Sequence, residues 1–366
     1  MKFGIQRDAL LKPLQQVNGV VERKQAMPVL SNVLLNCSPN GLELTGTDLE
    51  LEMIAHIPLE GATPGSTTVP ARKLSDIVKA LPEGADIDVT LEESRCILRS
   101  GKSRFTLSTL PAVEYPAMED ADALFSLAVP QRYLKGLLDR TSFAMAQQDV
   151  RYYLNGLLLE IEDNTLRTVA TDGHRLALCE MGTEHNPPEG VRIIVPRKGV
   201  TELTRQLDDV DDLVTLEFGR NHLRVRLDDL TFTTKLIDGK FPDYERVVPL
   251  DNRNVVTADR GRLREMIRRA SILSNEKYRG IRLQIRPGII NALAHNPEQE
   301  EAEEELEVQY NGPELEIGFN ASYLLDALSA IDSDTVYLRF ADSSSSCLID
   351  GEGDMTSRYV VMPMRL

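Results

Sequence analysis

The segment 169–180, VATDGHRLALCE, places an aspartate, a histidine and an arginine within positions 172–175. Such a group could perform acid–base catalysis, hold a phosphate, or form a turn against which another molecule docks. Catalysis lacks a nucleophile in a recognisable G-x-S-x-G elbow. A phosphate loop at 101–103 would need a glycine five residues before its own glycine, and Cys96 stands there. A tight turn, with Gly173 at positive φ, also accounts for the segment.

The same pattern occurs at three places in the chain. The stretches 42–54 and 166–178 both alternate apolar and polar residues around a Thr-Asp step, and the two steps lie 124 residues apart. A further 124 residues on, His295 and Asn296 stand inside another strand–turn–strand pattern. Repeats in register over nearly the whole chain indicate three tandem copies of one structural unit.

Each copy has the same expected elements. A helix with apolar residues at 3.6-residue spacing precedes the turn, a second helix follows it, and alternating strands fill the rest. The expected helices are 6–20, 71–81, 131–148, 196–207, 259–273 and 320–331. The prediction is an α+β fold of three tandem units, each with two helices on an antiparallel sheet of seven or eight strands. The predicted domains are 1–124, 125–250 and 251–366.

The charge is unevenly distributed between these elements. The chain has a formal net charge of -16, whereas its six expected helices together count +9. One interpretation is that lysine and arginine simply favour helices, but glutamate favours them equally and is scarce in these six. The other is a segregated positive surface that attracts phosphates. No base-reading motif is evident, so nucleic acid would be bound through its backbone, independently of sequence.

Other classes of protein find little support. No apolar run approaches the roughly 20 residues of a membrane helix, and the N-terminus lacks a signal-peptide pattern. The five histidines are scattered, so neither a metal site nor a cofactor is expected. The four cysteines lie far apart without a C-x-x-C pair, which is typical of reduced thiols in a cytoplasmic protein.

Several stretches give the chain a family resemblance. These are TGTDLELEM, QQDVRYYLNG, ATDGHRLA, VPRKGV, DGKFPDYERVVP, NPEQEEAEEE and YVVMPMRL. Together they resemble the bacterial DNA polymerase III β-subunit family of sliding clamps, over essentially all 366 residues. The resemblance implies a non-enzymatic, head-to-tail homodimeric ring that encircles duplex DNA and confers processivity. Twelve helices at about 10 Å spacing would surround a hole of roughly 28 Å.

The resemblance also implies three sets of functional residues. The DNA-binding set is Lys24, Arg72, Gln148, Tyr152, Tyr153 and Lys198, with Arg23 an alternative to Lys24. The groove that binds partner peptides comprises Leu154, Thr171, Gly173, His174, Arg175, Leu176, Pro242, Arg246, Val247, Tyr278, Asn320, Tyr323, Ser344, Ser346, Val360, Val361, Met362, Pro363, Met364 and Arg365. The dimer interface comprises Lys73, Arg95, Lys102, Arg104, Phe105, Leu107, Ile272, Leu273, Glu298, Glu300, Glu301, Glu303 and Glu304.

The implied partners are duplex DNA, a second copy of the chain, replicative and repair DNA polymerases, the clamp loader and other proteins with a clamp-binding motif. In the groove, Met, Val, Leu and Pro would form adaptable apolar walls. Two alternatives remain open from the residues. One is a triplicated protein-interaction scaffold without topological DNA binding; the other is a hydrolase that uses acidic residues and His174.

Overall fold

The computed structural model describes residues 1–22, 27–116, 118, 123–184, 187 and 190–365. The chain separates into two compact units. The first contains residues 1–132 and 201–236, and the second contains 133–200 and 237–366. Each unit is therefore built from one outer repeat and part of the middle repeat.

Six α-helices lie in the described residues, two in each repeat. Their bounds are α1 (Arg7–Asn18), α2 (Ala71–Ala80), α3 (Gln131–Thr141), α4 (Arg197–Gln206), α5 (Arg260–Ala270) and α6 (Ala321–Ala330). Side chains cap two of them: Asp259 accepts from the backbone N–H of Arg262, and Asn320 from that of Ser322. Each helix buries an apolar stripe and leaves its polar face in solvent, as the sequence periodicity predicts.

Two expected helices are too long. The helix expected over 131–148 ends at Thr141, where a 3₁₀ turn (Ser142–Ala144) follows. The Thr141 hydroxyl donates to the carbonyl of Leu137 at 2.7 Å, a side-chain bond that competes with continuation of the helix. The helix expected over 259–273 likewise ends in a 3₁₀ turn, Ser271–Leu273. In both cases the error lies at the C-terminal end.

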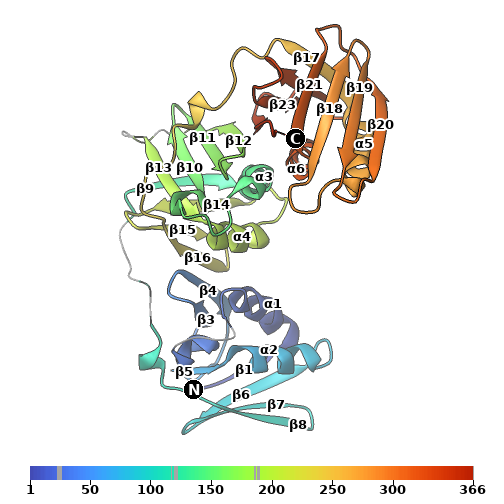
Figure 1. Ribbon diagram of the computed structural model, residues 1–366. Helices are drawn as coiled ribbons and strands as arrows, with labels where there is room; N and C mark the ends of the chain where they lie inside the picture. Colours follow the sequence, from blue (N-terminus) through green and yellow to red (C-terminus); the bar gives the residue numbers. More distant parts are fainter. Residues whose placement is uncertain (23–26, 117, 119–122, 185–186, 188–189, 366) are drawn as a thin grey trace. The chain divides into compact units, whose positions relative to one another are not determined.

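In the first unit, α1 and α2 pack side by side over antiparallel strands (Figure 1). One sheet has four strands in the order β1-β6-β7-β8, and the other has eight in the order β5-β2-β3-β4-β16-β15-β14-β9. Their bounds are β1 (Lys2–Gln6), β2 (Asn32–Ser38), β3 (Gly41–Thr47), β4 (Leu51–Pro58), β5 (Gly65–Pro70), β6 (Asp86–Glu92), β7 (Arg95–Ser100), β8 (Ser103–Ser108), β9 (Phe125–Pro130), β14 (Leu213–Phe218), β15 (His222–Arg226) and β16 (Leu230–Lys235).

The second unit contains an eight-stranded sheet in the order β13-β10-β11-β12-β24-β23-β22-β17. Its four-stranded sheet, β20-β19-β18-β21, packs against α5 (Figure 1). The bounds are β10 (Gly156–Glu162), β11 (Thr165–Thr171), β12 (Arg175–Gly182), β13 (Val191–Pro196), β17 (Asn254–Asp259), β18 (Gly280–Arg286), β19 (Ile289–His295), β20 (Glu301–Glu307), β21 (Leu315–Asn320), β22 (Thr335–Phe340), β23 (Cys347–Gly351) and β24 (Ser357–Val361).

The two eight-stranded sheets have the same strand order once eight is added to each strand number of the first sheet. In both eight-stranded sheets, the second to fifth strands of one repeat join the first, sixth, seventh and eighth strands of the next. The joints are β4 with β16 and β12 with β24, both antiparallel. Phe232 on β16 and Tyr359 on β24 are fully buried at these joints. Each repeat thus contains eight strands in the described residues, which confirms the predicted helix-on-antiparallel-sheet fold.

Candidate functional sites

The turn at 171–175 is held by its own side chains. One carboxylate oxygen of Asp172 accepts from the backbone N–H groups of His174 and Arg175, at 2.9 and 3.1 Å. Gly173 has φ +88°, and a Cβ there would lie 2.9 Å from the Arg151 guanidinium. The site therefore favours glycine both for its backbone conformation and for its space.

The equivalent turn of the first repeat has the same construction. Asp48 accepts from the backbone N–H groups of Glu50 and Leu51, at 2.9 and 2.7 Å. Leu49 occupies the positive-φ place, at +76°. Because this copy makes the turn without a histidine, the aspartate belongs to the scaffold, and His174 and Arg175 are what distinguish the second copy.

Arg175 connects the turn to two other elements of its unit. Its guanidinium donates to the carboxylate of Asp172 at 3.1 Å, to Asp326 on α6 at 2.5 Å, and to the carbonyl of Phe143 at 2.8 Å. The guanidinium carbon also lies 4.5 Å from the ring centroid of Tyr323. Such a multiply bonded arginine is a structural anchor, with three anionic or carbonyl partners and two aromatic neighbours, Tyr323 and Phe143.

A mostly apolar pocket of about 160 Å³ opens beside this turn. The fully buried Leu154, Leu176 and Val360 form its floor, whereas Met362 is exposed at its edge. A pocket with aliphatic walls and few polar groups suits apolar anchor residues. Its lining includes these residues of the predicted groove: Leu154, Thr171, Gly173, Arg175, Leu176, Pro242, Val247, Val360 and Met362. It also includes Arg151 and Tyr244, which the sequence did not indicate, and Tyr153, which was predicted to contact DNA.

The remaining predicted groove residues lie around this pocket or apart from it. His174 and Tyr323 line a neighbouring polar pocket of about 330 Å³ that shares Arg175. Tyr278, Met364 and Arg365 line a third, of about 360 Å³, with Asn275, Gly280 and His295. Six others line none of these three pockets: Arg246, Asn320, Ser344, Ser346, Val361 and Pro363. The predicted set therefore divides between a central pocket, a neighbouring polar pocket, a third pocket and residues that line none of them.

The C-terminal segment fixes one wall of the central pocket. The backbone N–H of Met362 donates to the carbonyl of His174 at 2.9 Å, and that of Met364 to Gly318 at 2.7 Å. Val360 and Val361 pair with Leu176 and Arg175 across the β12–β24 joint. The tail is thus part of the sheet framework and also supplies lining side chains.

Three of the predicted DNA-binding residues lie on one segment: Gln148 stands between the 3₁₀ turns 142–144 and 152–154, and Tyr152 and Tyr153 belong to the second turn. Gln148 has φ +56° and is exposed. Tyr152 is also exposed, and its ring contacts that of Tyr153 edge-on at 5.8 Å between centroids. Asp149 braces the loop through Arg151, whose hydrogen bonds lower the pKa of that carboxyl to about 2.

The other predicted DNA contacts are dispersed. Arg72 is exposed on α2, and Lys198 is half-buried near the start of α4. Lys24 and its alternative Arg23 lie outside the described residues. Gln148, Tyr152 and Tyr153 therefore share one segment of the second unit, whereas Arg72 and Lys198 lie on helices.

Three of the basic residues predicted for the interface, Arg95, Lys102 and Arg104, lie on the β7–β8 hairpin at the edge of the first four-stranded sheet. β8 is the outer strand of that sheet. Arg99 and Arg104 stand opposite each other in the β7–β8 pair, and both are exposed. Within the described part of the chain, Arg95, Arg99, Lys102 and Arg104 make no ion pair. Directly opposed like charges destabilise a strand pair, so this edge is suited to an anionic partner.

The acidic residues occupy the edge of the other four-stranded sheet. β20 is its outer strand, and Glu301, Glu303, Glu305 and Glu307 alternate along one face. Glu304, on the other face, pairs with Arg269 of α5 at 2.7 Å. Glu298 and Glu300 lie in the preceding turn, where Asn296 bonds to Glu300. An edge strand with this charge is protected from pairing with most other strands.

The apolar residues predicted for the same interface differ in exposure. Ile272 is 69% exposed and Leu273 is half-buried. Phe105 is half-buried on β8, whereas Leu107 is already buried within its own unit. Lys73 is exposed on α2. Ile272 and Phe105 therefore have the most apolar surface left for a partner.

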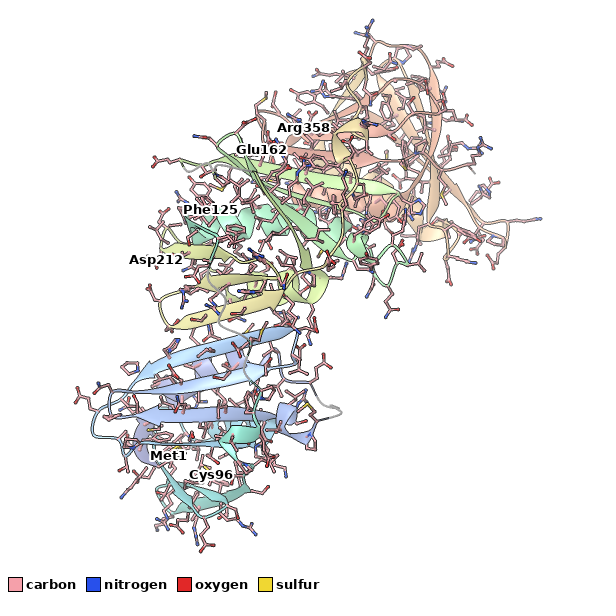
Figure 2. All side chains as sticks on the ribbon, turned by 90° about the vertical axis from the view of Figure 1, so that its left-hand side faces the viewer. Met1, Cys96, Phe125, Glu162, Asp212 and Arg358 are labelled. Carbon is pink, nitrogen blue, oxygen red and sulfur yellow. The ribbon has the colours of Figure 1, made fainter. Side chains whose placement is uncertain are left out.

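The cysteines are buried, and burial raises the pKa of the Cys96 thiol to about 11. Cys96 lies on β7 in the first unit (Figure 2). The described residues contain no group of three or more His, Cys, Asp or Glu side chains placed to hold a metal ion. None of the helices in the described part of the chain has the length and apolarity that a membrane crossing requires.

Comparison with known proteins defines the class. The chain matches three family models of the DNA polymerase III beta subunit: the N-terminal domain over residues 1–119, the central domain over 128–243 and the C-terminal domain over 245–365. The beta sliding clamp of Pseudomonas aeruginosa is 55% identical over 367 residues, covering 100% of both chains.

Solved structures agree. The Pseudomonas aeruginosa sliding clamp bound to griselimycin matches with a TM-score of 0.98, 55% identity and 100% coverage of both chains. Caulobacter crescentus pol III beta matches with a TM-score of 0.95, 40% identity and the same coverage. The chain belongs to the DNA polymerase III beta subunit family, the beta sliding clamps, and its function is that of a sliding clamp.

Proposed function

We propose that two copies of this chain join head to tail into a closed, non-enzymatic ring in the cytoplasm. The ring encircles duplex DNA without reading its sequence and tethers polymerases, the clamp loader and other partners through the groove. The observation that carries this proposal is the pair of edge strands, β8 and β20, which have opposite charge and are the eighth strand of the first repeat and the fourth strand of the third.

The repeat itself indicates how two copies join. Within the chain, the fourth strand of a repeat pairs with the eighth strand of the next, as β4 does with β16 and β12 with β24. Among the fourth and eighth strands of the described repeats, two lie at sheet edges without such a partner. These are β8, the eighth strand of the first repeat, and β20, the fourth strand of the third. Pairing β8 of one copy with β20 of another would extend the same rule, and a heterologous contact of this kind closes into a ring.

The equivalent positions give a register for this joint. Phe105, Phe232 and Tyr359 occupy the same place in their hairpins, opposite Leu98, Val225 and Ile349 respectively. Across the joints, Phe232 pairs with Met53 and Tyr359 pairs with Ala177. Met53 and Ala177 each lie one residue beyond the residue pair that closes the turn before their strand. The corresponding residue of β20 is Ala302, because His295 pairs with Glu301. Phe105 would therefore face Ala302 of the second copy, and Arg104 would face Glu303.

The groove proposal rests on the central pocket. Its aliphatic floor and the adaptable Met362 favour a short peptide with apolar anchors in extended form, and several partners sharing one such groove must compete for it. The related Pseudomonas aeruginosa sliding clamp binds griselimycin, which makes this compound a probe for the groove. We place the DNA contacts at Lys24, Arg72, Gln148, Tyr152, Tyr153 and Lys198, and the domains at 1–124, 125–250 and 251–366.

A charge exchange tests the proposed joint. Arg104→Glu and Glu303→Arg should each weaken the dimer by about tenfold, because each places like charges opposite one another. The double variant should recover most of that affinity. The matched control combines Arg104→Glu with Glu307→Arg, a substitution four residues further along β20. This control should not recover the dimer affinity.

Sedimentation over a concentration series would measure the dimer dissociation constant of each variant. Equal dissociation constants for the two double variants would contradict the register. If every single variant kept the wild-type constant, the edge joint itself would be wrong, and a scaffold without a closed ring would become the better explanation.

A further inference from the structure

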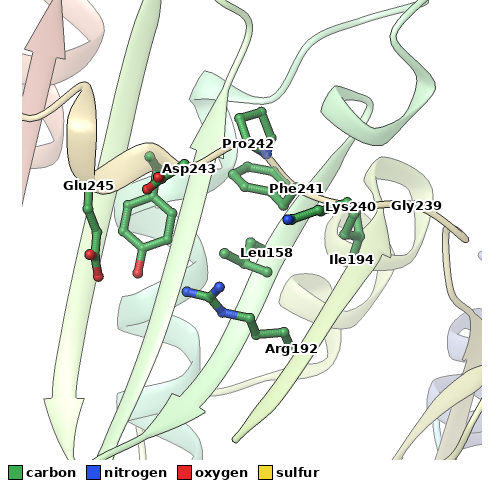
Figure 3. Close-up of a pocket in the computed structure, with 10 residues that line it drawn as sticks. Leu158, Arg192, Ile194, Gly239, Lys240, Phe241, Pro242, Asp243 and Glu245 are labelled. Carbon is green, nitrogen blue, oxygen red and sulfur yellow. The ribbon is translucent and has the colours of Figure 1, made fainter.

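A fourth cavity lies beside the segment 239–245, here called the strap, across from the central pocket of the groove. The strap crosses the face of the eight-stranded sheet of the second unit (Figure 3). Its volume is about 370 Å³. Leu158, Ile194 and Phe241 give it an apolar floor, and all three are buried. Pro242 and Tyr244 line both this cavity and the central pocket of the groove. The two cavities are therefore neighbours that share the strap as a wall.

A buried ion network fixes one wall. Glu160 is only 1% exposed, and its carboxylate accepts from the Tyr244 hydroxyl at 2.5 Å, from Arg167 at 3.0 Å and from the Nε of Arg192. Burial would raise the pKa of Glu160, but the bonds from Tyr244 and Arg192 overcome it and hold the pKa below its ordinary value. Arg192 is thus held in place by an ionised partner beneath it.

The arginine at the rim of the cavity, Arg192, has hydrogen-bond donors that no group in the described residues uses. Arg192 is more than half exposed, and its terminal Nη atoms make no hydrogen bond within the described part of the chain. Lys240 extends over the floor beside it (Figure 3) and is likewise without an ion pair among the described residues. Two cations with unused donors above an apolar floor suit a carboxylate on an otherwise apolar segment.

The opposite end of the cavity is anionic. Asp243 is neutralised by Arg246 at 2.7 Å, whereas Glu245 forms no ion pair in the described residues and lies away from Arg192 (Figure 3). The cavity is therefore polarised, positive at Arg192 and Lys240 and negative at Glu245. Only an occupant with its negative charge at the first end gains from this arrangement.

We propose that the cavity beneath the strap binds an acidic side chain of the same partner peptide whose apolar residues fill the groove. The inference rests on the groove function proposed above, because the shared wall with that groove is what brings a peptide here. It adds a specificity element: partners with an acidic residue flanking the apolar anchors bind more tightly than partners with a neutral one.

The test uses the full chain and three fluorescent synthetic peptides. Each carries two adjacent apolar anchor residues, with an Asp-Asp pair before them, an Asp-Asp pair after them, or serines in both places. Fluorescence anisotropy gives the dissociation constants. One acidic peptide should bind the wild type about threefold more tightly than the serine peptide, the gain expected from a rim ion pair.

Three variants locate the effect. Lys240→Ala should abolish the advantage of the acidic peptide, and Glu245→Gln should enlarge it, while neither changes the affinity for the serine peptide. Arg358→Ala removes one exposed positive charge from β24, away from all four cavities, and should change nothing.

The failures are distinguishable. If the serine peptide binds and competes with griselimycin, but both acidic peptides bind no better, this inference is wrong and the groove stands. If Arg358→Ala lowers the acidic advantage as much as Lys240→Ala does, the effect is general charge and the cavity is not its site. If no peptide binds, the groove proposal is wrong, and this inference is wrong as well because it rests on that proposal.

Discussion

At the scale of the residue, the turn at 171–175 combines a local backbone conformation with contacts to distant segments of the chain. Gly173 at positive φ was predictable, because glycine follows a Thr-Asp step there. Arg151 and Tyr244 were missed, because polar and aromatic residues on irregular segments have no periodic signal that assigns them to a pocket. Arg175 was assigned to the groove, but its bonds to Asp326 and Phe143 depend on segments far away in the chain.

The buried Glu160 provides a prediction at this scale. Its pKa is lowered from an ordinary value of 4.5, so its ionised form favours the folded state. That contribution is present above about pH 4.5 and is lost as the pH falls through the lower folded value. Glu160→Gln should cost about 3 kcal/mol at pH 7, because Arg167 and Arg192 lose their shared anion. The cost should shrink below pH 4.5.

Urea unfolding of the wild type and the variant at equal concentration, at pH 7 and at pH 3.5, measures the difference. The same loss at both pH values would mean that the Glu160→Gln substitution disturbs packing and that the charge network contributes little.

At the scale of the element, apolar alternation predicted the strands and 3.6-residue spacing predicted the helices. At the two helix ends that were wrong, after Thr141 and Ala270, a side-chain hydroxyl bonds to a carbonyl of the last turn: Thr141 to Leu137 and Ser271 to Arg268. The joints β4–β16 and β12–β24 were not predicted, because pairing between distant strands leaves no local pattern in either one. Those joints are nevertheless what identifies β8 and β20 as complementary edges.

The C-terminal segment provides a prediction at this scale. Removing residues 362–366 deletes the Met362 wall of the central pocket and the backbone bonds to His174 and Gly318. Two lost hydrogen bonds should lower the free energy of unfolding by about 2 kcal/mol. Peptide affinity should fall at least about tenfold, which is the effect expected when an energetically important interface residue is removed.

Met362→Ala is the control, since it keeps the backbone bonds and removes only the side chain. It should retain most of the stability and still weaken peptide binding. Wild-type peptide affinity in the truncated chain, measured by anisotropy, would show that the groove lies elsewhere.

At the scale of the whole molecule, the charge pattern and the fold point the same way. The net charge of -16 discourages nonspecific adhesion of the body, whereas the six expected helices together count +9. Two opposite edges on one chain give a joint that a second copy can satisfy twice. A clamp that holds DNA by linkage needs only weak contacts with the phosphates, so individual DNA-contact variants should slow loading more than they shorten retention.

Topological retention is the most direct test of the ring. The protein is loaded onto nicked circular DNA by its ATP-dependent loader, freed of unbound protein, and the DNA is then cut once with a restriction enzyme. A closed ring predicts retention on the circle and rapid release once the DNA has free ends. Equal retention on circular and linear DNA would contradict encirclement, because a bound protein that stays on linear DNA is held by its contacts alone.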